Sequence, residues 1–175
     1  MFALDRCRAA LEKIVNNHEK HGKKRVTAFS FPLKFRCDSE SLEDILKGLR
    51  DSIYRKPKAG DQQSLIGETK YTVLNCPQID GYSLSQEFTG FEMVISPAGS
   101  ESNDDPDALF LVDVKLGGFH VKPYEGGTCD VSFKATCRIN LEEDAVSALR
   151  YNEIGDVVLT LVPPTVQQAD PDDDE

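Results

Sequence analysis

A strictly alternating stretch between Asp130 and Ile139 constrains the fold of this chain more than any other feature. Apolar side chains follow one another at every second position there, as in a strand with one buried face and one solvated face. The inward set is Val131, Phe133, Ala135, Cys137 and Ile139, and the outward set is Asp130, Ser132, Lys134, Thr136 and Arg138. We therefore expect this stretch to be a strand of a half-buried sheet.

The residues before that strand predict the rest of a sheet meander over 108–140. Leu109 to Val114 is an almost continuous apolar run, which is typical of a strand buried on both faces. The glycine pairs Gly117-Gly118 and Gly126-Gly127 tolerate positive φ, so we expect the chain to reverse at each of them.

A second alternating stretch, from Val26 to Cys37, predicts another strand with a buried face. Its inward stripe contains Phe29, Phe31, Leu33 and Phe35. Pro32 cannot donate a ladder hydrogen bond, so it predicts an edge or a bulge at that point.

Three segments show helical rather than strand periodicity. Residues 4–20 have apolar side chains at helical spacing, a second segment is capped by Ser39 or Ser41, and a third is capped by Asn140. The second segment carries a buried stripe of Leu42, Ile45, Leu46, Leu49 and Ile53. We therefore predict a single α+β domain over residues 1–164, with an antiparallel-rich sheet of about seven strands covered by about three helices. Residues 165–175 are too acidic to bury a core and are expected to form a disordered tail.

Charge divides the chain into two unequal parts. The chain has 20 basic and 30 acidic residues. Residues 1–58 contain 14 basic and 8 acidic residues, and the remainder contains 6 basic and 22 acidic residues. Such asymmetry suggests two electrostatic faces, although the basic part can equally lie over the acidic part and neutralise it.

The basic residues gather most densely at the end of the second predicted helix. Arg50, Arg55, Lys56 and Lys58 surround Tyr54, which we expect to be exposed. An aromatic ring beside cations is the usual combination for contacting phosphates and bases. The alternative is a basic last turn that complements the helix dipole.

Two acidic segments are candidate partner-binding surfaces. The loop over residues 97–106 is polar, and Asp104, Asp105 and Asp107 lie at its end. The tail contains Asp172, Asp173, Asp174 and Glu175. An acidic surface can occupy sites that otherwise bind DNA phosphates, because both attract clusters of Lys and Arg.

The chain lacks recognisable catalytic, nucleotide-binding and metal-binding motifs. We therefore expect no enzyme activity, no catalytic residue, no cofactor and no metal. The five cysteines are odd in number, widely spaced and without a CxxC pair, which predicts reduced thiols in a cytoplasmic protein. No apolar run approaches the roughly 20 residues that span a bilayer, so we expect no membrane association.

Four segments carry a resemblance to a known group of proteins. They are FALDRCRAALEKI, LEDILKGLRDSIYRKPKAGD, LFLVDVKLGGFHVKPYEGGTCDVSFKATCRI and VVLTLVPP, with the turn Glu125–Thr128 and the ending Leu159–Pro164 as the most distinctive marks. The chain resembles small, functionally unassigned acidic proteins of bacteriophages and prophages, which tend to be encoded among replication and recombination genes. The resemblance covers residues 2–164 and transfers no functional residue.

This context implies a non-catalytic phage accessory protein that works in the host cytoplasm by binding another macromolecule. The preferred hypothesis is an acidic surface that modulates DNA-handling or host-defence proteins. The alternative is a single-stranded DNA-binding or recombination accessory protein that uses the basic N-terminal third. The partner and the oligomeric state are open at this point.

Overall fold

The protein is built mainly from strands. The computed structural model describes residues 2–21, 24–58, 61, 70–103, 105–138 and 155–165. Strands account for 56% of the structure and helices for 10%. The elements in chain order are β1 (Leu4–Leu11), β2 (Val15–His21), β3 (Lys24–Asp38), the 3₁₀ turn η1 (Ser39–Ser41), α1 (Leu42–Ile45), α2 (Leu49–Ile53), β4 (Tyr54–Arg55), β5 (Val73–Leu74), β6 (Tyr82–Ser83), β7 (Phe88–Pro97), β8 (Leu109–Tyr124), β9 (Thr128–Cys137) and β10 (Gly155–Val162).

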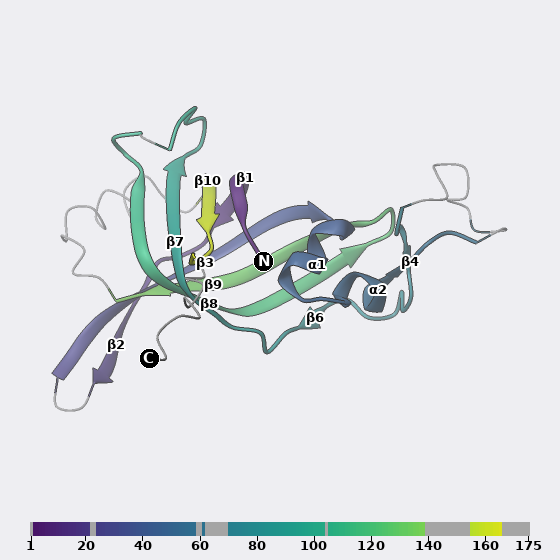
Figure 1. Ribbon diagram of the computed structural model, residues 1–175, viewed down its shortest axis with the longest axis horizontal. Helices are drawn as coiled ribbons and strands as arrows, with labels where there is room; N and C mark the ends of the chain where they lie inside the picture. Colours follow the sequence, from purple (N-terminus) through teal and green to yellow (C-terminus); the bar gives the residue numbers. More distant parts are fainter. Residues whose placement is uncertain are drawn as a thin grey trace, which may run out of the picture.

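Six of these strands close into an antiparallel barrel. The hydrogen-bonded order is β1-β10-β7-β8-β9-β3, and β3 pairs in turn with β1, which closes the ring. β2 continues the pairing with the first half of β3, and β6 adds to β8 (Figure 1). The expected α+β sheet covered by three helices is therefore wrong: closure satisfies the strand edges with other strands rather than by covering the sheet with helices.

Four β-bulges curl the sheet into this barrel. At each one, two residues of a strand lie opposite a single residue of its neighbour, and one of the two has a positive φ. A bulge bends its strand and increases the local twist, which a small closed barrel requires. The positive-φ residues are Arg6, Gly90, Asp113 and Gly118.

The first predicted helix, residues 4–20, is a correction. The chain there forms β1 and β2, and β1 pairs with both β10 and β3. Ala9 and Leu11 are buried, whereas Arg8 is exposed, so the alternation of a strand is present beside the helical spacing. The hydrogen bonds of β1 to β10 and β3 stabilise the strand, although the apolar spacing is also compatible with a helix.

The second predicted helix is present only as short pieces. α1 ends at Ile45 because Leu46 is extended, and Gly48 has φ 82° between α1 and α2. Leu46, expected in the buried stripe, is 40% exposed. The helix expected after Asn140 lies outside the described residues, as do residues 166–175 of the expected tail.

Strand β8 also corrects two expectations. It runs without reversal through Gly117 and Gly118, which form one of the bulges, and the chain reverses only at 125–127. Phe110 and Val112 are 60% and 57% exposed, so the first half of β8 is not buried on both faces.

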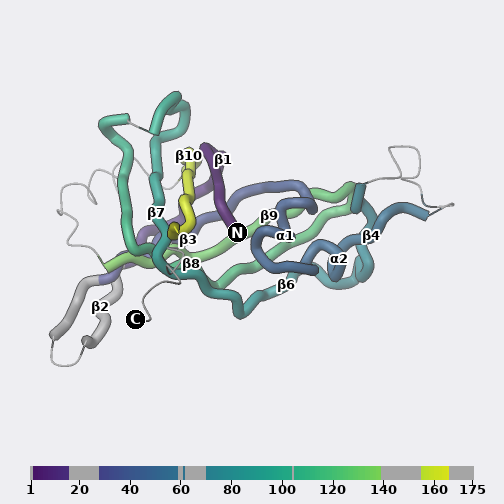
Figure 2. The backbone as a smooth tube through the Cα atoms, viewed as in Figure 1, coloured from purple at the N-terminus to yellow at the C-terminus, as the bar shows by residue number. Residues whose placement is uncertain are grey.

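One hydrophobic core fills the barrel and continues under the helices. Phe31, Leu33, Val131 and Phe133 of the inward stripes are buried as predicted, whereas Ile139 lies outside the described residues. The hairpin β8–β9 extends beyond the barrel, and η1, α1 and α2 lie over one face of this extension (Figures 1 and 2). The other face of β3, β9 and β8 carries exposed lysine and arginine side chains, and it positions the candidate site.

Candidate polyanion interface

The outward face of β3, β9 and β8 carries a regular array of cations. Alternation sends every second side chain outward, and these include Lys34 and Arg36 on β3, Lys134 on β9, and Lys115 and Lys122 on β8. All five are exposed. The outward carboxylates of these three strands are Asp38, Asp113 and Asp130. We call the five cations, together with Tyr124, the cationic face.

Strand register arranges this face in rows that cross three strands. Arg36, Asp130 and Lys122 are paired across β3, β9 and β8, and the next row is Lys34, Ser132 and His120. Successive rows are about 6.6 Å apart, because two residues of a strand rise by that distance. The following two rows are Pro32, Lys134 and Gly117, then Ser30, Thr136 and Lys115.

Asp130 lies at the centre of the first row and organises its neighbours. Its Oδ1 accepts from Arg36 Nε at 2.8 Å, and its Oδ2 accepts from Tyr124 Oη at 2.9 Å and lies 3.0 Å from Lys34 Nζ. The hydrogen bond from Arg36 is the main cause that lowers the pKa of Asp130 to about 2, with Lys34 and Tyr124 adding to it. Asp130 is only 6% exposed, whereas the side chains of Lys34 and Arg36 are largely exposed. The carboxylate therefore pairs directly with the Lys34 ammonium and with Nε of the Arg36 guanidinium, while both cationic side chains remain partly exposed to solvent.

Tyr124 places an aromatic ring among these cations. The Arg36 guanidinium carbon lies 5.3 Å from the ring centroid, and Lys122 Nζ lies 5.7 Å from it. Both distances are within the range of cation–π attraction. An aromatic ring bordered by Arg and Lys is the arrangement on which bases stack while the cations contact phosphates.

A depression of about 480 Å³ lies on the same face, beside Lys134 and Lys115. Lys115 Nζ is 2.8 Å from Glu87 Oε2, so of the two lysines that line the depression Lys115 is already paired. A volume of this size is within the range of small-ligand sites. Its lining residues are Glu12, Pro32, Leu33, Glu87, Lys115, Gly117, Gly118, Ser132, Phe133, Lys134 and Thr136.

Tyr54, expected to be an exposed contact residue, is completely buried. Its hydroxyl accepts from Tyr124 N at 3.1 Å and lies 2.6 Å from the carbonyl oxygen of Thr128. Burial is the main cause that raises its pKa. Its role is structural, because it joins the end of α2 to the β8–β9 hairpin beneath the cationic face.

The basic residues around Tyr54 are largely engaged with partners. Arg50 contacts Glu40 and Asp51. Hydrogen bonds to carboxylates raise the pKa of both Arg50 and Arg55. Arg55 Nη1 is 2.7 Å from Asp61 Oδ2, and the hydrogen bond from Arg55 lowers the pKa of Asp61 to about 2. Lys58 is exposed and donates only its backbone N–H to Asp61.

The aromatic partner of this predicted patch is Tyr71 rather than Tyr54. The Arg50 guanidinium carbon lies 4.1 Å from the Tyr71 ring centroid, and Lys56 Nζ lies 5.4 Å from it. The backbone next to Tyr71 is bound to the β8–β9 turn, since Gly126 N donates to Thr72 O at 3.0 Å. The patch and the first row of the cationic face are thus attached to the same hairpin end.

The predicted acidic surface is only partly described. Asp107 is exposed, and Asp105 has a lowered pKa because its carboxylate accepts from the backbone of Asp107. The same loop is held by Arg6, which donates to Asn103 Oδ1 at 3.2 Å and to the carbonyl oxygen of Ser100. Asp104, Asp172, Asp173, Asp174 and Glu175 lie outside the described residues.

Sequence reasoning missed the cationic face although part of its signal was present. The alternation of β9 correctly places Lys134 outward, and that of β3 does the same for Lys34 and Arg36. Lys122 and Tyr124 were missed because the expected reversal at Gly117-Gly118 obscured the second half of β8. The polar members of the alternating strands were the signal that could have identified this surface.

Comparisons with known proteins add no further assignment. Comparisons with protein-family models, curated proteins and solved structures found no match. Within the described part of the chain, no group of three or more His, Cys, Asp or Glu side chains could hold a metal ion. No helix among the described residues is long and apolar enough to cross a membrane.

Proposed function

We propose that this protein is a non-catalytic accessory protein that binds single-stranded nucleic acid on the cationic face. The observation that carries the proposal is the row of Arg36, Asp130 and Lys122 around Tyr124, continued along the strands by Lys34, Lys134 and Lys115. It combines a track of cations with an aromatic platform. Proteins that bind single strands without sequence preference use this combination.

The net charge of −10 does not oppose such binding at physiological salt. The Debye length there is about 8 Å, so a strand lying on the cationic face responds mainly to the charges nearest to it. Lys34 and Arg36 are paired with Asp130, and Lys115 is paired with Glu87. Lys122 and Lys134 form no ion pair with a described carboxylate, so these two exposed lysines would make the first phosphate contacts.

Single-stranded nucleic acid suits this surface better than a duplex. Tyr124 presents its ring only to a base that is free to unstack from its neighbours, which a single strand allows. A duplex would offer phosphates alone, and it would leave the aromatic ring without a role.

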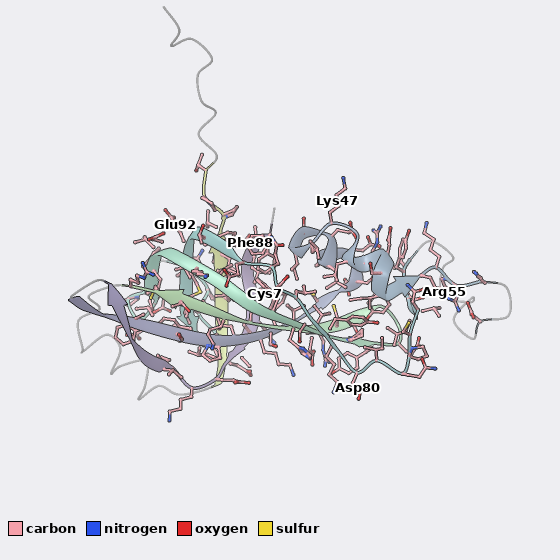
Figure 3. All side chains as sticks on the ribbon, turned by 90° about the horizontal axis from the view of Figure 1, so that it is seen from below. Cys7, Lys47, Arg55, Asp80, Phe88 and Glu92 are labelled. Atoms are coloured by element: carbon pink, nitrogen blue, oxygen red, sulfur yellow. The ribbon has the colours of Figure 1, made fainter. Side chains whose placement is uncertain are left out.

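The test uses a fluorescently labelled oligothymidylate and measures anisotropy at several salt concentrations. We expect affinity to fall steeply with salt, and Lys134→Ala to weaken binding and reduce the salt slope by about 0.7, as for the loss of one phosphate contact. Lys47→Ala is the matched control. It removes the same charge from an exposed lysine on the helical side of the molecule, and should leave binding unchanged (Figure 3).

A second candidate function is the acidic-surface binding of a DNA-handling or host-defence protein in the cytoplasm of a phage-infected cell. Exposed Phe110 and Val112 favour it, because both lie on β8 within three residues of the exposed carboxylate of Asp113. Such a patch suits a basic partner with apolar side chains. No oligothymidylate binding at low salt would reject the first function in favour of this one. The phage context of both candidates comes from the resemblance of the sequence alone.

A further inference from the structure

Two cysteines that are distant in sequence meet on neighbouring strands. Cys37 near the end of β3 and Cys129 at the start of β9 are direct Cα partners in the antiparallel ladder. Their Sγ atoms are 3.5 Å apart, and the Cys129 thiol also lies 3.7 Å from the carbonyl oxygen of Cys37. Both are free thiols in this structure.

The backbone at this position already fits a disulfide. Directly opposed residues of an antiparallel pair have Cα atoms about 4.5–5.5 Å apart, and disulfides bridge Cα atoms about 4.4–6.8 Å apart. The sulfur atoms need only approach from 3.5 Å to a bond length of about 2.05 Å, which rotation of the two side chains can supply. The neighbouring pairs, Arg36 with Asp130 and Asp38 with Thr128, hold the strands in register on both sides.

We propose that Cys37 and Cys129 form a reversible oxidation site that closes to a cross-strand disulfide when it reacts with a peroxide. In the first step one cysteine loses its proton, its thiolate attacks a peroxide oxygen, and the O–O bond breaks. The departing hydroxide takes up that proton, so a sulfenic acid and water are formed. In the second step the other thiol loses its proton, attacks the sulfenic sulfur and releases a second water. Two thiols and hydrogen peroxide thus give one disulfide and two waters.

The surroundings of the pair favour this chemistry. Cys37 is half-buried and offers an approach from solvent, whereas Cys129 is fully buried and protected from larger reagents. The hydrogen bond with Cys37 lowers the pKa of Cys129, so Cys129 is the thiolate of the pair, and a peroxide small enough to pass Cys37 reacts with it. The same hydrogen bond and burial raise the pKa of Cys37, which is therefore the second thiol, the one that closes the disulfide.

The other cysteines provide comparisons within the same chain. Cys76 is exposed, and Cys137 is buried further along β9. Cys7 lies close enough to Cys37 for an electrostatic effect, and burial raises its pKa. Cys7 is thus the alternative partner that an experiment must distinguish from Cys129.

The experiment treats the reduced full chain with hydrogen peroxide, then alkylates all remaining thiols in denaturant. We expect an intact mass with three alkylated cysteines out of five, one linked pair of peptides containing Cys37 and Cys129, and return to five alkylated thiols after dithiothreitol. The oxidised protein should also melt several degrees higher, because the bond closes a loop between residues 92 positions apart and restricts the unfolded chain.

Three variants make the outcome specific. Cys37→Ser should abolish both the linked peptide and the rise in melting temperature, whereas Cys7→Ser and Cys76→Ser should retain both. A linked peptide joining Cys7 to Cys37 would overturn the proposal. So would five alkylated thiols after treatment, or oxidation of either Cys37 or Cys129 to a sulfinic acid without a disulfide. Because the readouts are mass and melting temperature, the result is independent of nucleic-acid binding.

Discussion

The buried hydroxyl of Tyr54 is bonded to the backbone of Tyr124, and so the residue that ends α2 anchors the hairpin that carries the cationic face. Tyr124 N donates to Tyr54 Oη at 3.1 Å, and the hydroxyl in turn lies 3.0 Å from Tyr124 O and 2.6 Å from Thr128 O. On the other side of the same strand end, the Tyr124 ring contacts Arg36 and Lys122. One hydroxyl thus links the helical layer to the candidate interface.

Removing that hydroxyl should destabilise the protein. Tyr54→Phe keeps the ring but leaves Tyr124 N and Thr128 O without their partner, which we expect to cost about 1–3 kcal/mol of unfolding free energy. A urea midpoint measures this loss. Tyr82→Phe is the control, because the Tyr82 hydroxyl has no hydrogen bond to another described residue, and it should change the midpoint little. Equal midpoints for the two variants would contradict the anchoring role of Tyr54.

The ion pairs of Asp130 should make stability depend on acidic pH. Its folded pKa of about 2 is below the usual value of 3.8, so the ionised form stabilises the fold, and this contribution is lost as pH falls from about 4 to about 2. Allowing for the solvent exposure of Lys34 and Arg36, we expect Asp130→Asn to cost on the order of 1–2 kcal/mol at pH 7.

Denaturation of the wild type and of Asp130→Asn at pH 7, 4 and 2.5 measures this dependence. The difference between the two proteins should be largest at pH 7 and shrink toward the lowest pH. Asp38→Asn removes another outward carboxylate of β3, one with no ion pair to a described residue, and it should stay within about 0.5 kcal/mol of wild type. A difference for Asp130→Asn that stays constant across pH would show that its ionisation does not stabilise the fold.

The turn between β8 and β9 contains two glycines that both have a positive φ but differ in the atoms around them. Gly126 and Gly127 have φ values of 96° and 80°, so a side chain at either is strained. A Cβ at Gly127 would lie 2.6 Å from the carbonyl oxygen of Tyr71, whereas one at Gly126 would meet nothing within 4 Å. We expect Gly126→Ala to cost about 1–2 kcal/mol for its backbone alone, and Gly127→Ala to cost more.

Thermal unfolding of the two glycine variants isolates the contact with the segment around Tyr71. Gly127→Ala should have the lower melting temperature of the two, because its Cβ forces that segment away from the hairpin. Equal melting temperatures would mean that the Tyr71 segment moves aside at no cost, and that it does not support the hairpin end.

The local alternation of this sequence determined which faces of its central strands are buried. Val131, Phe133, Phe31 and Leu33 point inward as their period of two predicts, since a strand in any sheet alternates its side chains. The same rule places Lys34 and Lys134 outward, so part of the candidate interface could be predicted from the sequence. The absence of a long apolar run and the acidic composition of the last residues are likewise properties of the sequence alone.

The tertiary structure decided which strands meet, and this governs the remainder of the site. The segment of β1 has spacing compatible with a helix, and only its hydrogen bonds to β10 and β3 make it a strand. Tyr124 meets Arg36, and Cys37 meets Cys129, through register across strands that are about ninety residues apart in the chain. Local residue patterns carry no information on such pairing. It follows from closing the barrel, in which every strand edge finds a partner, and from the bulges that set the register when it closes.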